Sequence, residues 1–98
     1  MTEDWLAGLG REFDALAARS KLEQAVAADP RHPLTHSALA AAWGILGYEG
    51  KAREEAEKAF TLSGSLSREE RLSVEARHRE ASNQWDQAVE IYRSLVRF

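Results

Sequence analysis

One stretch, residues 39–60, constrains the fold of this 98-residue chain more strongly than any other. It reads LAAAWGILGYEGKAREEAEKAF, and its apolar residues recur at steps of three and four, the spacing of one helix face. Gly47 and Gly50 divide it into two such helices. Small alanines on the second helix let its backbone approach the bulky Trp43 on the first. The stretch therefore predicts an antiparallel helix pair with Trp43 wedged between the two helices.

The same pattern occurs on both sides of this stretch. Moving 34 residues toward the N-terminus places Leu39 on Trp5, Trp43 on Leu9, Ala52 on Ala18, Ala56 on Leu22 and Ala59 on Ala25. Moving 36 residues toward the C-terminus places Gly47 on Asn83, Ala52 on Ala88, Ala56 on Tyr92 and Ala59 on Leu95. A recurrence of about 34 residues with two helices in each unit predicts a helical-repeat architecture.

These positions resemble the tetratricopeptide-repeat (TPR) family over nearly the whole chain. The matching residues are Leu39, Ala40, Trp43, Gly47, Ala52, Ala59 and, after the first repeat, Pro30. The first repeat departs from the family pattern at Phe13, where a small turn residue would stand. The third departs at Glu75 and Arg79, where apolar groups would stand. The resemblance implies an all-α, TPR-type solenoid of about six antiparallel helices in two and a half to three repeats.

Composition and charge narrow the class of protein. Hydrophobic residues make up 44% of the chain and charged residues 30%, which favours one small globular domain over disorder. The net charge is −3, whereas nucleic-acid phosphates call for a basic surface, so we expect no nucleic-acid binding. No apolar run approaches the ~20 residues that span a membrane, so we expect no membrane insertion. The chain has no cysteine, which removes disulfides, thiolate metal sites and cysteine nucleophiles.

Glycines and prolines predict the helix ends in the first half. Gly8 and Gly10 weaken the first helix, so we expect it to be short or bent. We expect its partner helix over Asp14–Ala28, ending before Pro30 because the residue before a proline avoids helical geometry. The inner face of that helix would hold Leu16, Leu22, Ala25 and Val26. Pro33 suits the first turn of the next helix.

The second half has its own signals. Gly64 would end the second repeat, and Ser67 with Glu70 forms a capping box that opens a highly charged helix. Leu72 and Ala76, with either Val74 or Ala81, would supply its buried side; the pattern leaves that choice open.

The resulting prediction is one domain over 1–98, with repeats at about 1–32, 33–66 and 67–98, cut from a longer protein.

No constellation of residues points to catalysis or to a cofactor. Nucleophile motifs and phosphate-binding loops are missing, so we expect no enzyme, no catalytic residue and no cofactor. His32 and His36 have the four-residue spacing of two metal ligands on a helix. A third ligand is not nearby, so we expect two solvent-facing histidines and no metal.

The expected functional surface is the concave groove lined by the first helix of each repeat. Helix geometry and the repeat pattern assign to it Arg11, Ser37, Ala41, Ile45, Ser73, Arg77 and Glu80. Family members that hold a peptide carboxylate use Lys, Asn and Arg at such positions. Only Arg11 and Arg77 match here, so the resemblance gives little support for a carboxylate clamp.

The last third, residues 63–98, looks like the TPR region attached to bacterial serine/threonine kinases and winged-helix transcriptional regulators. This resemblance implies a non-catalytic protein–protein interaction or scaffolding module of a bacterial regulatory protein. The alternative is an effector-sensing domain that binds a small molecule in the groove and signals to a tethered kinase or DNA-binding domain. In either case, a protein, a peptide or a small effector is the expected ligand.

The final helix has an apolar face about 180° wide at 100° per residue. On a helical wheel, Trp85, Val89, Tyr92 and Val96 suffice to pack against the preceding helix. Ile91, Leu95 and Phe98 would then remain uncovered. They predict self-association as a two-fold homodimer through this helix.

Overall fold

A computed structural model describes the backbone of residues 2–96 and the side chains of residues 14–96. Its elements are α1 (Thr2–Ala28), α2 (Pro33–Ile45), α3 (Glu49–Thr61), the 3-10 turn η1 (Ser63–Ser65), α4 (Arg68–Ala81) and α5 (Trp85–Val96). Residues 2–96 contain no strand, so the prediction of an all-α chain is confirmed.

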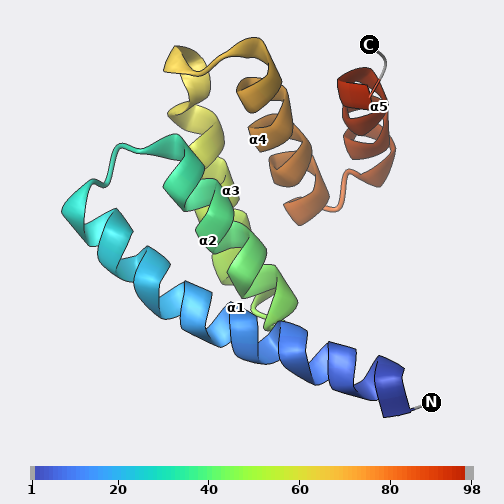
Figure 1. Cartoon of the computed structure of the whole chain (residues 1–98). Helices are drawn as coiled ribbons and strands as arrows, with labels where there is room; N and C mark the ends of the chain where they lie inside the picture. Colours follow the sequence, from blue (N-terminus) through green and yellow to red (C-terminus); the bar gives the residue numbers. More distant parts are fainter. Residues whose placement is uncertain (1, 97–98) are drawn as a thin grey trace.

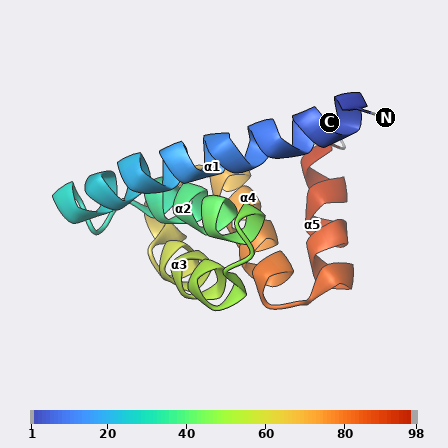
Figure 2. The same cartoon turned by 90° about the horizontal axis from the view of Figure 1, so that it is seen from below.

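Each helix packs on the next one along the chain (Figure 1). The extensive contacts are α1 with α2, α2 with α3, α3 with α4, and α4 with α5, and α2 also touches α4. The α2–α3 pair lies in the centre, with α1 on one side and α4 on the other. Turning the molecule shows α1 as the longest helix, running across the other helices, with α5 at the far edge (Figure 2). The two outer helices therefore have one principal neighbour each.

The first unit differs from the prediction. Six helices were expected, whereas residues 2–96 form five, because α1 is one continuous helix of 27 residues. Gly8 and Gly10 lie inside α1 without ending it. A glycine in a helix costs only about 1 kcal/mol relative to alanine, which a long helix tolerates. Phe13, where the repeat pattern calls for a small turn residue, also lies within the helix.

Several predicted helix ends are confirmed. Pro33 occupies the first turn of α2, and the His32 side chain caps that helix by accepting the Thr35 N–H at 3.4 Å. The capping box at α4 is complete, since Ser67 Oγ accepts the Glu70 N–H and the Glu70 carboxylate accepts the Ser67 N–H, both at 3.3 Å. Gly64 lies in η1, beyond the end of α3.

The turns that follow α2 and α4 have the same geometry. Gly47 has φ +87°, and the backbone bonds are Tyr48 N–H to Trp43 O at 2.9 Å and Gly47 N–H to Gly44 O at 3.1 Å. Asn83 has φ +61°, and the bonds are Gln84 N–H to Arg79 O at 2.7 Å and Asn83 N–H to Glu80 O at 3.1 Å. Both are Schellman caps, which need a residue with positive φ just past the helix end. Equivalent positions in the two turns lie 36 residues apart, as the sequence recurrence predicted.

Trp43 lies at the centre of the core, as predicted. It is 8% exposed and clusters with buried Leu39 and Ala52, while Leu22, Val26 and Leu46 pack against this cluster. The Lys51 ammonium of α3 lies 4.6 Å from the centre of the indole ring, and the Arg19 guanidinium of α1 lies 5.4 Å from it. One indole ring therefore contacts side chains of both neighbouring helices, with cation–π attraction from each.

The structure shows which face of α1 and which face of α4 is buried. On α1, Leu22 and Val26 are partly buried as predicted, but Leu16 and Ala25 are exposed and Ala15 is buried instead. On α4, Val74 is 1% exposed and Ala76 is fully buried, which settles the choice that the sequence left open.

Candidate functional site

A groove of about 380 Å³ lies between the α2–α3 pair and the turn that joins α4 to α5. Its lining residues are Ala40, Ala41, Gly44, Ile45, Glu49, Ala52, Arg77, Glu80, Ala81, Asn83 and Trp85. The groove exists because the residues that line it from α2, α3 and α4 are mostly alanine and glycine, whose side chains are too small to fill the space between the helices. Volumes of this size are typical of ligand sites, which start at about 300 Å³.

The structure brings four of the seven predicted groove residues together. Ala41 and Ile45 line the groove from α2, and Arg77 and Glu80 line it from α4. The other three do not take part as described: Ser37 is buried at 8% exposure outside the lining, Ser73 is exposed outside the lining, and the Arg11 side chain lies outside the described residues.

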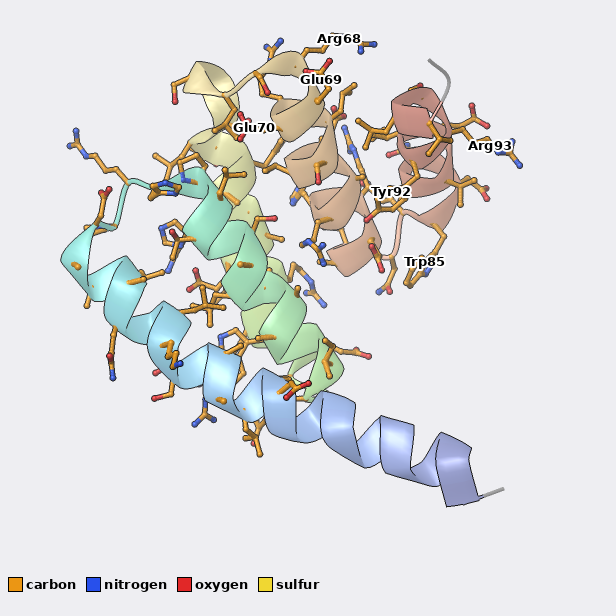
Figure 3. The ribbon with its side chains drawn as sticks, viewed as in Figure 1. Arg68, Glu69, Glu70, Trp85, Tyr92 and Arg93 are labelled. Carbon is orange, nitrogen blue, oxygen red and sulfur yellow. The ribbon has the colours of Figure 1, made fainter. Side chains whose placement is uncertain are left out.

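Sequence reasoning missed the wall that begins α5. Trp85 is 56% exposed and lines the groove at the start of that helix, where Figure 3 labels it. Ile45 on the opposite wall is 46% exposed, so two large apolar side chains are available to a ligand. The signal was present, because the repeat shift placed Asn83 in the turn and the residue two positions later must begin the next helix.

The charged residues of the groove are two carboxylates and one guanidinium. Glu80 accepts a 2.9 Å hydrogen bond from the Tyr92 hydroxyl of α5, which fixes the direction of its carboxylate. Burial, followed by this hydrogen bond and the Glu80 charge, raises the pKa of Tyr92 above its usual value, while Arg77 opposes the shift. Arg77 has no ion-pair partner among the described side chains. The groove thus offers a free cation, two carboxylates and apolar walls, which suits binding of a mixed polar and apolar ligand.

The turn beside the groove is held by side chains as well as by its cap. Arg79 donates to Gln84 Oε1 at 2.9 Å and lies 3.5 Å from the Glu75 carboxylate. The first contact links the end of α4 to the residue that precedes α5, and the second lies within α4. The Trp85 wall therefore follows a turn that is held by the Schellman cap and by one side-chain hydrogen bond.

The two histidines with metal-like spacing have structural contacts. His36 is 3% exposed, so the expectation that it faces solvent was wrong. Its Nε2 donates to the Pro30 carbonyl at 2.6 Å, because a carbonyl can only accept, and its Nδ1 lies 2.6 Å from a Glu55 carboxylate oxygen. His36 therefore joins the α1–α2 turn to α3. Among the described residues, no three His, Cys, Asp or Glu side chains are grouped as metal ligands would be.

The packing face of α5 is not the one drawn on the helical wheel. Ala88 is buried, and Ile91 and Leu95 are partly buried, on the helix whose principal neighbour is α4. Trp85, Val89, Tyr92 and Val96, expected to pack inward, are 39–82% exposed. The small Ala88 lets α4 approach closely on its own side, and this decides the face. Phe98 lies outside the described residues, so only two of the three predicted self-association residues can be placed.

The chain was compared with protein-family models, curated proteins and solved structures, and it matched none of them. Within residues 2–96, no helix is both long and apolar enough to cross a membrane.

Proposed function

We propose that this chain is a non-catalytic interaction module of the helical-repeat type, which binds a protein segment in the groove between its two matching helix pairs. The observation that carries the proposal is the groove itself, with a floor of alanines and glycine, exposed apolar walls at Ile45 and Trp85, and Arg77, which no described side chain pairs with. Such a surface accepts an apolar side chain and pairs with a nearby carboxylate.

The two Schellman turns support a repeat organisation. The ends of α2 and α4 lie 36 residues apart, as do the starts of α3 and α5, and the equivalent alanines Ala52 and Ala88 are both buried. Repeat arrays use the concave surface between stacked units for binding. The proposed parent is a bacterial signalling or regulatory protein, on the basis of the TPR resemblance described above.

A second candidate function has its own supporting observation. A volume of about 380 Å³ falls within the range of small-molecule sites, so the groove could instead hold a small effector and signal to a tethered domain. Peptide-array binding tests the first function. Thermal shifts induced by a panel of metabolites test the second.

Two glycines offer a matched pair of variants for the groove. Gly44 lines the groove and Gly50 does not, and at each of them an added Cβ meets nothing within 4 Å. Gly44→Gln should place a side chain across the groove, whereas Gly50→Gln should place one in solvent. Both replacements should leave the melting temperature unchanged or slightly higher, because glycine is a poor helix former. Loss of a peptide or metabolite signal in Gly44→Gln alone would support the groove, and equal binding by both variants would contradict it.

A further inference from the structure

The exposed apolar residues of α5 form one narrow stripe. Trp85, Val89, Tyr92 and Val96 are 56%, 44%, 39% and 82% exposed, respectively. At 100° per residue they fall within an arc of about 60° on the helix surface. Ala88 and Leu95, which are buried and partly buried, lie beside this arc. The stripe therefore runs along the length of α5 with its apolar surface largely exposed, although the Tyr92 hydroxyl bonds Glu80 of α4 and Trp85 borders the groove.

The opposite flank of the stripe carries two charges of opposite sign. Asp86 and Arg93 lie about 80–100° from Trp85 on the wheel, on the side away from Ala88. Arg93 points outward from α5 (Figure 3). Its intramolecular pair with Glu90, at 3.4 Å, is highly exposed at both residues, so Arg93 remains available to another partner. Asp86 has no ion-pair partner among the described residues.

We propose that two copies of this chain pair through the exposed stripe, with their α5 helices antiparallel about a two-fold axis. In this orientation Trp85 of one copy meets Val96 of the second, and Val89 meets Tyr92, so a large side chain faces a smaller one in each layer. Asp86 then lies within reach of the second copy's Arg93. Two-fold symmetry repeats that ion pair at the other end of the seam.

Charge selects both the partner and the orientation. In a parallel pair of α5 helices the charged flanks of the two copies would lie on opposite sides of the seam, so neither Asp86 nor Arg93 would gain a partner there. The antiparallel pair brings both flanks to the same side of the seam, where Asp86 of each copy lies within reach of Arg93 of the other. The stripe is thus complementary to itself in one orientation only, as expected for an interface between identical chains. Trp85 belongs both to the stripe and to the groove lining, whereas Val89, Asp86 and Arg93 lie outside the groove, so variants at these three residues test the seam separately from a groove ligand.

Sedimentation equilibrium over a wide concentration range tests the seam on the full chain. We expect the unaltered chain to dimerise and Val89→Lys to be monomeric, because Val89 lies near the middle of the stripe. Gln87→Lys adds the same charge to an exposed site on the opposite side of α5 and should dimerise normally. The far-UV circular dichroism of both variants should match that of the unaltered chain.

A charge swap tests the orientation. Asp86→Arg and Arg93→Asp should each raise the dimer Kd at low salt by about tenfold, which corresponds to ~1.4 kcal/mol. The double variant Asp86→Arg/Arg93→Asp restores attraction only in the antiparallel pair, so its Kd should return to within about threefold of the original. An unaltered chain that stays monomeric at millimolar concentration overturns the proposal. So does a dimer that survives Val89→Lys, or a double variant no better than the single ones.

Discussion

The α2–α3 and α4–α5 helix pairs share a backbone plan but differ in what they bury. Both are closed by a Schellman turn, and their helices end and begin at positions 36 residues apart. The first pair encloses Leu39 and Trp43 and is covered by α1 and α4. The second pair buries only small or medium side chains, among them Val74 and Ala76. Its main contact with the rest of the described chain is with α3, on one side only.

This difference shows that the residues that form the turns are distinct from the residues that stabilise the core. Local capping residues are enough to give both pairs the same turn, because the cap hydrogen bonds lie within a few residues of each other. Large apolar side chains then decide which pair supplies the stability of the domain. The second pair has the same turn but buries few large side chains. Its last helix, α5, therefore keeps apolar surface exposed to another molecule.

The largest expected effect comes from the interior of the first pair. Trp43→Ala should lower the free energy of unfolding by about 3–5 kcal/mol, since it removes a large aromatic ring from the core. Denaturant unfolding followed by circular dichroism measures the change. Trp85→Ala is the control in the second pair and should change stability by no more than about 1 kcal/mol, because Trp85 is mostly exposed. Similar losses in the two variants would contradict the claim that the buried position of Trp43 makes it the more important of the two tryptophans for stability.

The next effect concerns the bond that ties the first pair to the α1–α2 turn. His36→Leu leaves the Glu55 carboxylate, which is 13% exposed, without its imidazole partner, and it frees the Pro30 carbonyl. We expect a loss of about 1–3 kcal/mol in the free energy of unfolding. His32→Ala, on the same turn, removes only a long cap bond and should cost about 1 kcal/mol or less. If His36→Leu costs no more than this control, the buried link does not stabilise the fold.

A smaller effect should distinguish the two turns. Gly47→Ala forces a side chain to adopt φ near +87° and should cost about 1–2 kcal/mol. Asn83→Gly keeps the positive φ available and should stay within about 0.5 kcal/mol of the original, since asparagine already tolerates this conformation. Thermal melting of the two variants measures both values. If Gly47→Ala and Asn83→Gly lost the same stability, the positive φ angle would not explain the choice of residue at these two turns.

The smallest effect is a pH dependence at the junction of the two pairs. His78 of α4 stacks on Phe60 of α3 with ring centroids 4.9 Å apart, and burial, helped by Arg79, lowers the pKa of His78. The folded state therefore favours neutral His78. Its contribution is complete above the ordinary pKa of about 6.5 and is lost as pH falls through the lower folded value.

The His78 prediction is checked by unfolding the unaltered chain and His78→Phe between neutral and mildly acidic pH. The unaltered chain should lose more stability on acidification, because phenylalanine keeps the stack without a titrating group. Parallel pH profiles would assign the acid sensitivity to other groups.

Local signals predicted much of this fold. Pro33, Ser67, Gly47 and Asn83 lie at helix ends because each acts through its own backbone geometry or through a neighbour a few residues away. Trp43 was predictable as core because apolar residues recur around it at helical spacing. The all-α class follows from the same two kinds of signal.

Long-range packing limited the rest. His36 is buried beside the carboxylate of Glu55, 19 residues further along the chain, and a helical pattern in the sequence cannot predict such a contact. The glycines of α1 lower helix propensity without forbidding the helix, so its continuity depends on the whole chain. The wide apolar arc of α5 allowed two packing faces, and the position of α4 selected one. Trp85 moved from the predicted interior to the groove wall for the same reason.

Because α1 and α5 each have one principal neighbour, the molecule should open from its ends inward. Amide hydrogen exchange reports the free energy of such local opening, which is lowest where few buried contacts must be broken. Amides of α5 should therefore exchange first, followed by those of α1, and the amides around Trp43 should exchange last. A partner that covers the exposed stripe would slow exchange at the end of the chain that is otherwise least protected.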